Sequence, residues 1–423
     1  MLLFRYFLKE SFMFDIQKAD QKALEMIAPA VKEAEEISFF TTERVMEAFR
    51  EERVSEAHFA GSTGYGYGDR GRDTLDKVFA RALEAEDALV RPHFISGTHT
   101  LTVALFGVLR PGDIMLAATG KPYDTLDEVI GMQPNGDGSL ADFGIEYQQL
   151  DLKGGEIDYV GLEKALEQPK VKMVFLQKSK GYQDRPTLSS KEIGRVAQFV
   201  HEIRSDVIVM VDNCYGEFCE RHEPTYYGAD LMAGSLIKNA GGGIAPTGGY
   251  IAGRTDLIEL CAYRLTSAGI GRESGCTLNV LRELYQGLFL APHVVLQAKK
   301  TAMYAAAMLE QMGCESSPAH DAPRYDIIQS LIVGSPKRML AFCKGIQAGS
   351  PVDSFVTPEA WDMPGYDAPV VMAAGAFVMG ASIELSADGP IKPPYIVFLQ
   401  GGLTFESGRL GILRAIKEIN EQN

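Results

Sequence analysis

Residues 207–217 read Val-Ile-Val-Met-Val-Asp-Asn-Cys-Tyr-Gly-Glu, and residues 229–243 read Ala-Asp-Leu-Met-Ala-Gly-Ser-Leu-Ile-Lys-Asn-Ala-Gly-Gly-Gly. The first stretch begins with five apolar residues, a pattern typical of a parallel strand buried on both faces. That run ends at Asp212, and the second apolar run, residues 231–237, ends at Lys238. Open α/β sheets bind ligands at the carboxyl ends of their strands, so we expect this carboxylate and this amine to share one site.

An acid and an amine in this arrangement suggest the cofactor pyridoxal 5′-phosphate. The Lys238 amine can bond covalently to the cofactor's aldehyde, and Asp212 can keep its ring nitrogen protonated. In the alternative interpretation, Lys238 is a surface residue of the glycine-rich segment that follows it, and Asp212 only ends a strand. Spacing alone does not separate the two.

Bulk composition restricts the class of protein. The chain has 423 residues, of which 46% are hydrophobic and 23% charged, as expected for a globular protein of two or three lobes. The net charge of −15 and the absence of a Lys/Arg-rich run argue against a nucleic-acid partner. Six scattered cysteines indicate free thiols in a cytoplasmic protein rather than metal ligands, so we expect no metal site.

The first residues, 1–13, are an apolar run interrupted by Arg5 and Lys9. They lack a small-residue cleavage site and are too short and too charged to span a bilayer, so we expect neither a signal peptide nor a membrane span. Met13 is an alternative start, which would make residues 1–12 an extension.

Strand and helix patterns alternate along the first two thirds of the chain. This alternation predicts a mostly parallel central sheet with helices on both faces. We expect helices at residues 20–36, 42–51, 74–84, 97–109, 159–167 and 189–204, and strands at 114–119, 145–150, 171–177, 207–211, 231–237 and 247–252.

The chain changes character after residue 254. Long helices over residues 277–312 lead into strands near 327–333, 376–383 and 395–400 and a last helix near 406–421. We therefore expect a smaller C-terminal α+β domain. The predicted divisions are an N-terminal helical arm (1–60), a large α/β domain that binds the cofactor (61–285) and the small domain with its linking helices (286–423).

Two further segments have the composition of ligand-binding loops. Residues 61–74 combine many glycines with two tyrosines and two arginines, and the planar guanidinium of arginine suits phosphate recognition. The alternative for this segment is a flexible linker. Residues 96–98, Ser-Gly-Thr, stand where a helix is expected to begin, and the free N–H groups of a helix start can bind an anion.

Seven blocks carry a resemblance to a known family. They are Tyr-Gly-Tyr-Gly-Asp-Arg-Gly-Arg (65–72), Ser-Gly-Thr-His-Thr (96–100), Gly-Lys-Pro-Tyr-Asp-Thr (120–125), Gln-Lys-Ser-Lys-Gly-Tyr (177–182), Val-Asp-Asn-Cys-Tyr-Gly-Glu-Phe (211–218), Ser-Leu-Ile-Lys-Asn-Ala-Gly-Gly-Gly (235–243) and Leu-Gln-Gly-Gly-Leu-Thr-Phe-Glu (399–406). In this order they resemble fold-type I pyridoxal-phosphate enzymes, more narrowly the methionine γ-lyase/cystathionine β-lyase-like group linked to aluminium resistance.

The resemblance implies roles for three catalytic residues. Lys238 would hold the cofactor and then move the substrate's Cα proton. Asp212 would pair with the ring nitrogen, and Tyr123 would stack on the ring and serve as the acid for a leaving thiolate.

It also implies a phosphate site built at a helix start. Backbone N–H groups of residues 96–98, that is Ser96, Gly97 and Thr98, would hold the phosphate together with the Ser235 hydroxyl.

In related lyases a tyrosine and an arginine come from a partner subunit. The matching positions here are Tyr67 with Arg70 or Arg72, which implies a homodimer with shared active sites, expected to assemble further into a homotetramer.

Two departures from the family pattern concern binding. The better-known lyases have a hydroxyl residue directly before the lysine, where this chain has Ile237. Their arginine for the substrate carboxylate has no matching position. Arg272, Lys392 and Arg409 are the candidates, with Arg272 preferred because it lies in a glycine-rich loop.

The resemblance implies a carbon–sulfur lyase that acts on a sulfur amino acid of the cystathionine, methionine or cysteine type by β- or γ-elimination. Transamination and aldol cleavage use the same lysine and aspartate, so they remain alternatives. A non-catalytic stress or metal-tolerance protein that retains the fold is a third.

Overall fold

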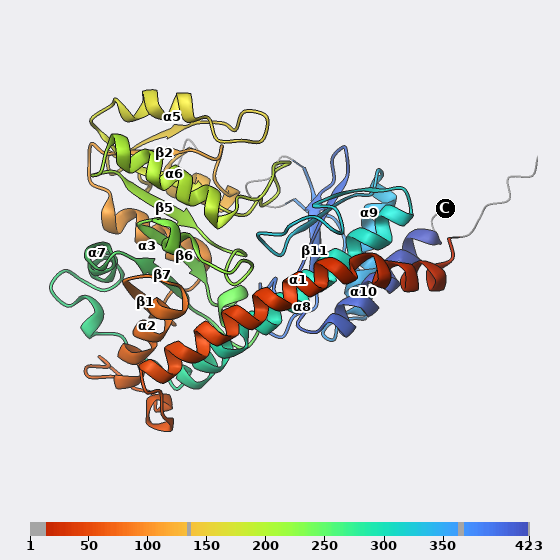
Figure 1. Cartoon of the computed structure of the whole chain (residues 1–423), viewed down its shortest axis with the longest axis horizontal. Helices are drawn as coiled ribbons and strands as arrows, with labels where there is room; N and C mark the ends of the chain where they lie inside the picture. Colours follow the sequence, from red (N-terminus) through yellow and green to blue (C-terminus); the bar gives the residue numbers. More distant parts are fainter. Residues whose placement is uncertain (1–13, 133–136, 363–367, 422–423) are drawn as a thin grey trace, which may run out of the picture.

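Two lobes are joined by two long helices that lie side by side along both of them (Figure 1). These helices are α1 (Ile16–Glu51) and α8 (Leu281–Gln311). The computed structural model describes residues 14–132, 137–362 and 368–421, so the expected extension at residues 1–12 lies outside the described part. Within that part, no helix is long and apolar enough to cross a membrane.

The large lobe is built on a seven-stranded sheet. Strand β7 runs antiparallel to both of its neighbours, and the remaining pairs are parallel. The strand order is β1 (Asp87–Arg91), β7 (Gly249–Gly253), β6 (Leu231–Ser235), β5 (Ile208–Asp212), β4 (Val171–Gln177), β2 (Ile114–Ala117) and β3 (Glu146–Gln149).

Helices cover both faces of this sheet. Alternate side chains of a strand point to opposite faces, so apolar side chains of one strand pack under helices on both sides. Met173 and Phe175 of β4 enter one apolar cluster, whereas Val174 and Leu176 enter another. The first cluster includes residues of α3 (Gly97–Val108), α4 (Asp127–Ile130) and α7 (Thr255–Leu265), and the second those of α2 (Arg70–Ala82), α5 (Tyr159–Leu166) and α6 (Ser190–Ile203). The predicted mostly parallel sheet with two covered faces is confirmed.

The small lobe contains a five-stranded antiparallel sheet that packs with two helices. The predicted small C-terminal α+β unit is therefore confirmed as an architecture, while domain limits at residues 60 and 285 stay predictions. Its strand order is β10 (Val370–Ala374), β11 (Ser386–Pro390), β12 (Ile396–Gln400), β9 (Gln329–Ile332) and β8 (Glu315–Ser317), and its helices are α9 (Pro336–Gly349) and α10 (Phe405–Asn420).

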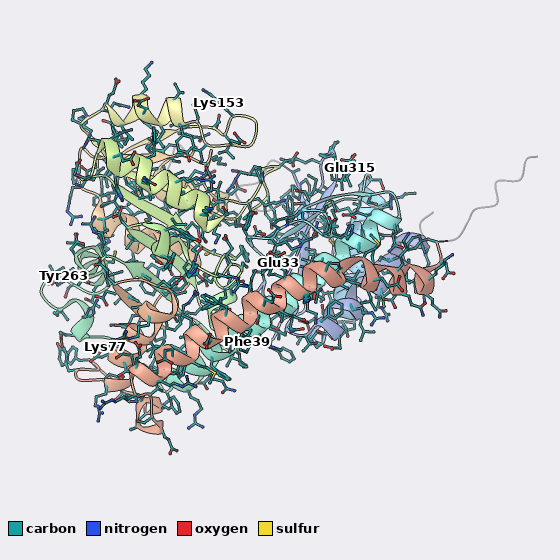
Figure 2. The ribbon with its side chains drawn as sticks, in the orientation of Figure 1. Glu33, Phe39, Lys77, Lys153, Tyr263 and Glu315 are labelled. Atoms are coloured by element: carbon teal, nitrogen blue, oxygen red, sulfur yellow. The ribbon has the colours of Figure 1, made fainter. Side chains whose placement is uncertain are left out.

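The N-terminal segment forms one helix where the sequence predicted two. Polar side chains between the two predicted helices are satisfied within the single helix: Ser38 Oγ donates to the Pro292 carbonyl of α8 at 3.1 Å, and Thr41 Oγ1 donates to the Ile37 carbonyl at 3.0 Å. Phe39, between them, is 75% exposed on α1 (Figure 2).

Other corrections concern loops and the small lobe. The predicted loop at 61–74 ends early, because Asp69 accepts a hydrogen bond from the Arg72 N–H at 2.9 Å and α2 begins at Arg70. The strand expected at 376–383 is wrong, since Gly380 has a φ of 81° and the segment turns between β10 and β11. Strands β1, β8, β10 and β11 and helices α7 and α9 were not predicted.

Candidate active site

Lys238 lies just beyond the carboxyl end of β6, and its ammonium group faces an aromatic ring. Its Nζ is 4.3 Å from the centroid of the Tyr215 ring, close enough for a cation–π interaction. Burial by itself lowers the pKa of Lys238, but the neighbouring Cys214, Tyr215 and Asp212 outweigh burial and raise the pKa above its ordinary value. The amine is therefore held as a cation next to Asp212.

Asp212 is the last residue of β5, the strand next to β6, and only 6% of its surface is exposed. Its Oδ1 accepts a hydrogen bond from the Cys214 N–H at 3.1 Å, which fixes the carboxylate at the strand end. Burial raises the pKa of Asp212, whereas the charge of Lys238 opposes that rise. The structure thus brings the predicted acid and amine together at the ends of adjacent strands.

The start of α3 approaches the same point. Ser96 caps this helix, since its Oγ accepts a hydrogen bond from the His99 N–H at 3.0 Å. A Cβ atom added to Gly97 would lie 3.5 Å from Ser235 Cβ and 4.0 Å from Lys238 Nζ. The first N–H groups of a helix have no partner within the helix, so a glycine here leaves them accessible to a ligand between Ser235 and the lysine.

Ser235 is buried at the end of β6, and its Oγ has no hydrogen-bond partner among the described residues. Thr98, in contrast, has its hydroxyl paired with Thr125 Oγ1 at 2.8 Å. A buried hydroxyl without a partner is uncommon in proteins and indicates a polar ligand at that position.

A cavity of about 230 Å³ opens above Lys238 between the two lobes. The large lobe contributes Tyr123, Tyr182 and Tyr215 to its lining. The small lobe contributes the polar side chains of Ser382, Ser386, Asp388 and Gln400. A hydrogen bond between two lining residues joins the lobes, since the hydroxyls of Tyr215 and Ser382 lie 2.8 Å apart.

The predicted residues of the 61–74 segment do not reach this cavity within the chain. Tyr67 is 61% exposed, and its ring stacks on Tyr65 with 5.5 Å between the centroids. Arg70 is exposed at the start of α2. Arg72 is buried and donates to the Gly66 carbonyl at 2.8 Å, so its guanidinium holds the loop of its own chain.

The three candidates for the substrate carboxylate lie away from the cavity lining. Arg272 forms an ion pair with Asp87 at 2.6 Å, and Arg409 forms one with Asp20 at 2.6 Å. Lys392 is exposed in the turn before β12. The structure does not bring any of them to Lys238.

Of the residues that line the cavity, sequence reasoning identified only Lys238 and Tyr123; those it missed include Tyr182, Tyr215 and Asp388. Tyr215 had a local signal, because it follows Asp212 by three residues within the segment 207–217. Its φ of 74° is unusual for a tyrosine and turns the ring toward Lys238. Asp388 lies on β11, a strand that was not predicted, so it had no comparable signal.

The sheet order, the second antiparallel sheet and a lysine and an aspartate at adjacent strand ends define the class of this protein: it has the fold of the fold-type I pyridoxal-phosphate enzymes. The pyridoxal-5′-phosphate-dependent protein YhfS from Escherichia coli shares this fold at 16% identity and a TM-score of 0.61, over 92% of this chain and 97% of that one. A family model described as methionine gamma-lyase matches residues 16–420, and the chain belongs to that family.

More similar relatives cover nearly the whole chain. A structure described as a carbon-sulfur lyase involved in aluminum resistance, from Clostridium novyi NT, is 52% identical with a TM-score of 0.92, and 96% of each chain is covered. The uncharacterized protein YnbB of Bacillus subtilis is 52% identical over 398 residues, 94% of each chain. The family resemblance stated from the sequence blocks is thereby confirmed.

Proposed function

We propose that this protein binds pyridoxal 5′-phosphate and acts as a carbon–sulfur lyase on a sulfur amino acid, by α-proton abstraction followed by β- or γ-elimination. The observation that carries the proposal is the meeting of Lys238 and Asp212 at adjacent strand ends beside the start of α3. The similarity to a protein described as a carbon-sulfur lyase supports it.

The residues at this place fit the cofactor. The unpartnered Ser235 hydroxyl and the N–H groups at Gly97 and Thr98 suit a phosphate, which accepts hydrogen bonds from both. Asp212 suits a protonated ring nitrogen, and the Lys238 amine suits an aldehyde. When bound there, the cofactor supplies an electron sink for the charge left after the Cα proton is removed.

The chain's own side chains would carry the proton transfers. Lys238 Nζ, once released by the incoming substrate amine, takes the Cα proton as a general base. Tyr123 lines the same cavity and would give a proton to the leaving sulfur. The Tyr215 ring restricts where the Lys238 amine can move, because the two are already in contact.

Elimination can be tested directly with purified protein supplied with the cofactor. We expect elimination to release a keto acid and ammonia, together with a thiol from L-cystathionine or L-methionine or hydrogen sulfide from L-cysteine, each measured by a separate assay. Amino-group transfer to an added keto acid without thiol release would instead favour transamination. A protein that takes up no cofactor would favour the non-catalytic alternative.

Replacement of Ser235 by alanine should weaken cofactor binding while leaving the cofactor-free protein as stable as before. The Ser235 Oγ has no partner within the described residues, so its removal breaks no protein hydrogen bond, but a phosphate contact worth about tenfold in affinity is lost. Dissociation constants for the cofactor and thermal unfolding of the cofactor-free protein measure the two effects.

Ser96→Ala provides the contrasting case, because it should lower the stability of the cofactor-free protein. Ser96 caps α3, so its replacement should cost about 1 kcal/mol of unfolding free energy. Equal cofactor affinity in wild type and Ser235→Ala would place the phosphate elsewhere.

We further propose a homodimer that shares its active sites and assembles into a homotetramer. The stacked and exposed rings of Tyr65 and Tyr67 support this assembly, since large exposed aromatic groups are typical of interfaces. Light scattering of the eluted protein should give two or four times the chain mass of 46.2 kDa. A single-chain mass with full lyase activity would contradict the shared site.

A further inference from the structure

Asp388 is a buried carboxylate on the small-lobe wall of the cavity. It lies in β11, where Met372 of β10 and Phe398 of β12 are its strand partners, and it lines the cavity that also contains Lys238. Only 7% of its surface is exposed, and its Oδ1 has no hydrogen-bond partner among the described residues. Burying a carboxylate oxygen without a hydrogen-bond partner costs free energy of folding, unless a ligand donates a hydrogen bond to that oxygen.

A second unpaired oxygen lies on the same wall. Ser386 precedes Asp388 by two residues, so both side chains emerge on the same face of β11. The Ser386 Oγ is buried and likewise lacks a partner within the described ranges, and Gln400 faces it across the strand pair. Two buried, unpaired oxygens on neighbouring residues that line one cavity indicate a built subsite for a group that donates hydrogen bonds.

The charges around this subsite favour a cation. Among the described residues that line the cavity, Lys238 is the one cation and Asp388 is the one carboxylate. Burial raises the pKa of Asp388 to about 7, and a hydrogen bond from Tyr182 opposes that rise. Besides Lys238 and Tyr182, the titratable groups near Asp388 within the described part of the chain are Tyr123, Tyr215 and, from α9, Cys343. None of these three can carry a positive charge.

We propose that Asp388, together with Ser386, binds a second amino group carried on the side chain of the substrate. The inference rests on the proposed function, because the reacting amino group of the same substrate must lie at Lys238. An ammonium group would donate to Oδ1 and to the serine hydroxyl in charge-assisted hydrogen bonds. A substrate without that amino group would leave the two oxygens unpaired. The site can therefore discriminate strongly between substrates that have a second amino group and substrates that lack one. The favoured substrates are therefore diamino acids of the cystathionine type rather than methionine.

Two amino acids of equal chain length test this subsite without turnover. L-ornithine ends in an ammonium group where L-norleucine ends in a methyl group. By isothermal titration calorimetry of the cofactor-loaded protein, we expect wild type to bind L-ornithine at least about tenfold more tightly than L-norleucine. In Asp388→Asn this ratio should fall to about threefold or less, and in Ser386→Ala by a smaller factor. Equal binding of both ligands by wild type, or an unchanged ratio in Asp388→Asn, would overturn the proposal.

The pH dependence provides a second readout with a definite sign. The carboxylate form of Asp388 binds the ammonium group, and this form is lost as pH falls below about 7. L-ornithine affinity of the wild type should therefore weaken by up to tenfold per pH unit below that value, whereas in Asp388→Asn it should show little such slope. Parallel slopes in the two proteins would overturn the assignment.

Failure of this inference can be told apart from failure of the proposed function. Suppose that thiol is released from L-cystathionine and L-methionine alike, and that Asp388→Asn lowers kcat/KM equally for both. The lyase activity would then be supported, and the proposed amine subsite would be wrong. If Asp388→Asn lowers kcat/KM at least about tenfold more for L-cystathionine, the subsite stands. If no thiol appears but the preference for L-ornithine depends on Asp388, the amine subsite would be supported and the proposed elimination reaction would be wrong.

Discussion

Replacement of Lys238 by alanine is expected to abolish elimination, with kcat lowered by at least about 10⁴-fold, and to abolish the visible absorbance of covalently bound cofactor. The two losses share a cause, because one amine both holds the aldehyde and moves the Cα proton. The position of Lys238 beside Asp212, Tyr215 and the start of α3 supports both roles.

The wild-type protein contains its own control for this prediction. Lys178 and Lys180 are also buried, but Lys178 is paired with Glu220 at 2.8 Å and Lys180 donates to the Ser317 carbonyl at 3.0 Å. After borohydride reduction, mass spectrometry should find the cofactor on the peptide that contains Lys238. A label on either of the other two lysines, or normal absorbance and activity in Lys238→Ala, would overturn the assignment.

Much of the large lobe was predictable because its strands are locally encoded. A largely apolar run such as residues 171–177, whose polar members are Lys172 and Gln177, is mostly buried, and its limits match β4. Strand β1 was missed because charged residues end it, and these charges are neutralised by distant partners: Asp87 pairs with Arg272, and Arg91 pairs with Asp76 at 2.6 Å. No local pattern contains those pairings.

The same distinction applies to the candidate site. Lys238 and Asp212 each end an apolar run, so their place at the edge of the sheet follows from sequence. The opposite wall of the cavity depends on how the small lobe packs against the large one. The place of residues such as Asp388 in the site therefore could not be predicted from sequence. Arg272 and Arg409 carry the charge expected for a carboxylate site, but their ion pairs within the chain use that charge elsewhere.

Replacement of Asp212 by asparagine should separate cofactor attachment from catalysis. The asparagine Oδ1 can still accept the hydrogen bond that Asp212 receives from the Cys214 N–H, so we expect the strand end to keep its shape. Lys238 is intact in this variant, and the cofactor should remain covalently attached. The amide has no charge to hold a proton on the ring nitrogen, so the electron sink should be weaker.

We expect kcat of Asp212→Asn to fall by about 10³-fold, equivalent to about 4 kcal/mol of transition-state stabilisation, with a much smaller change in KM. Borohydride should still fix the cofactor to Lys238, unlike in Lys238→Ala. The burial of Asp212 makes this loss large, because a charge acts more strongly in a site from which water is excluded. Full turnover in Asp212→Asn would mean that the ring nitrogen is held by another group, and the two-strand site inferred from Asp212 and Lys238 would then be wrong.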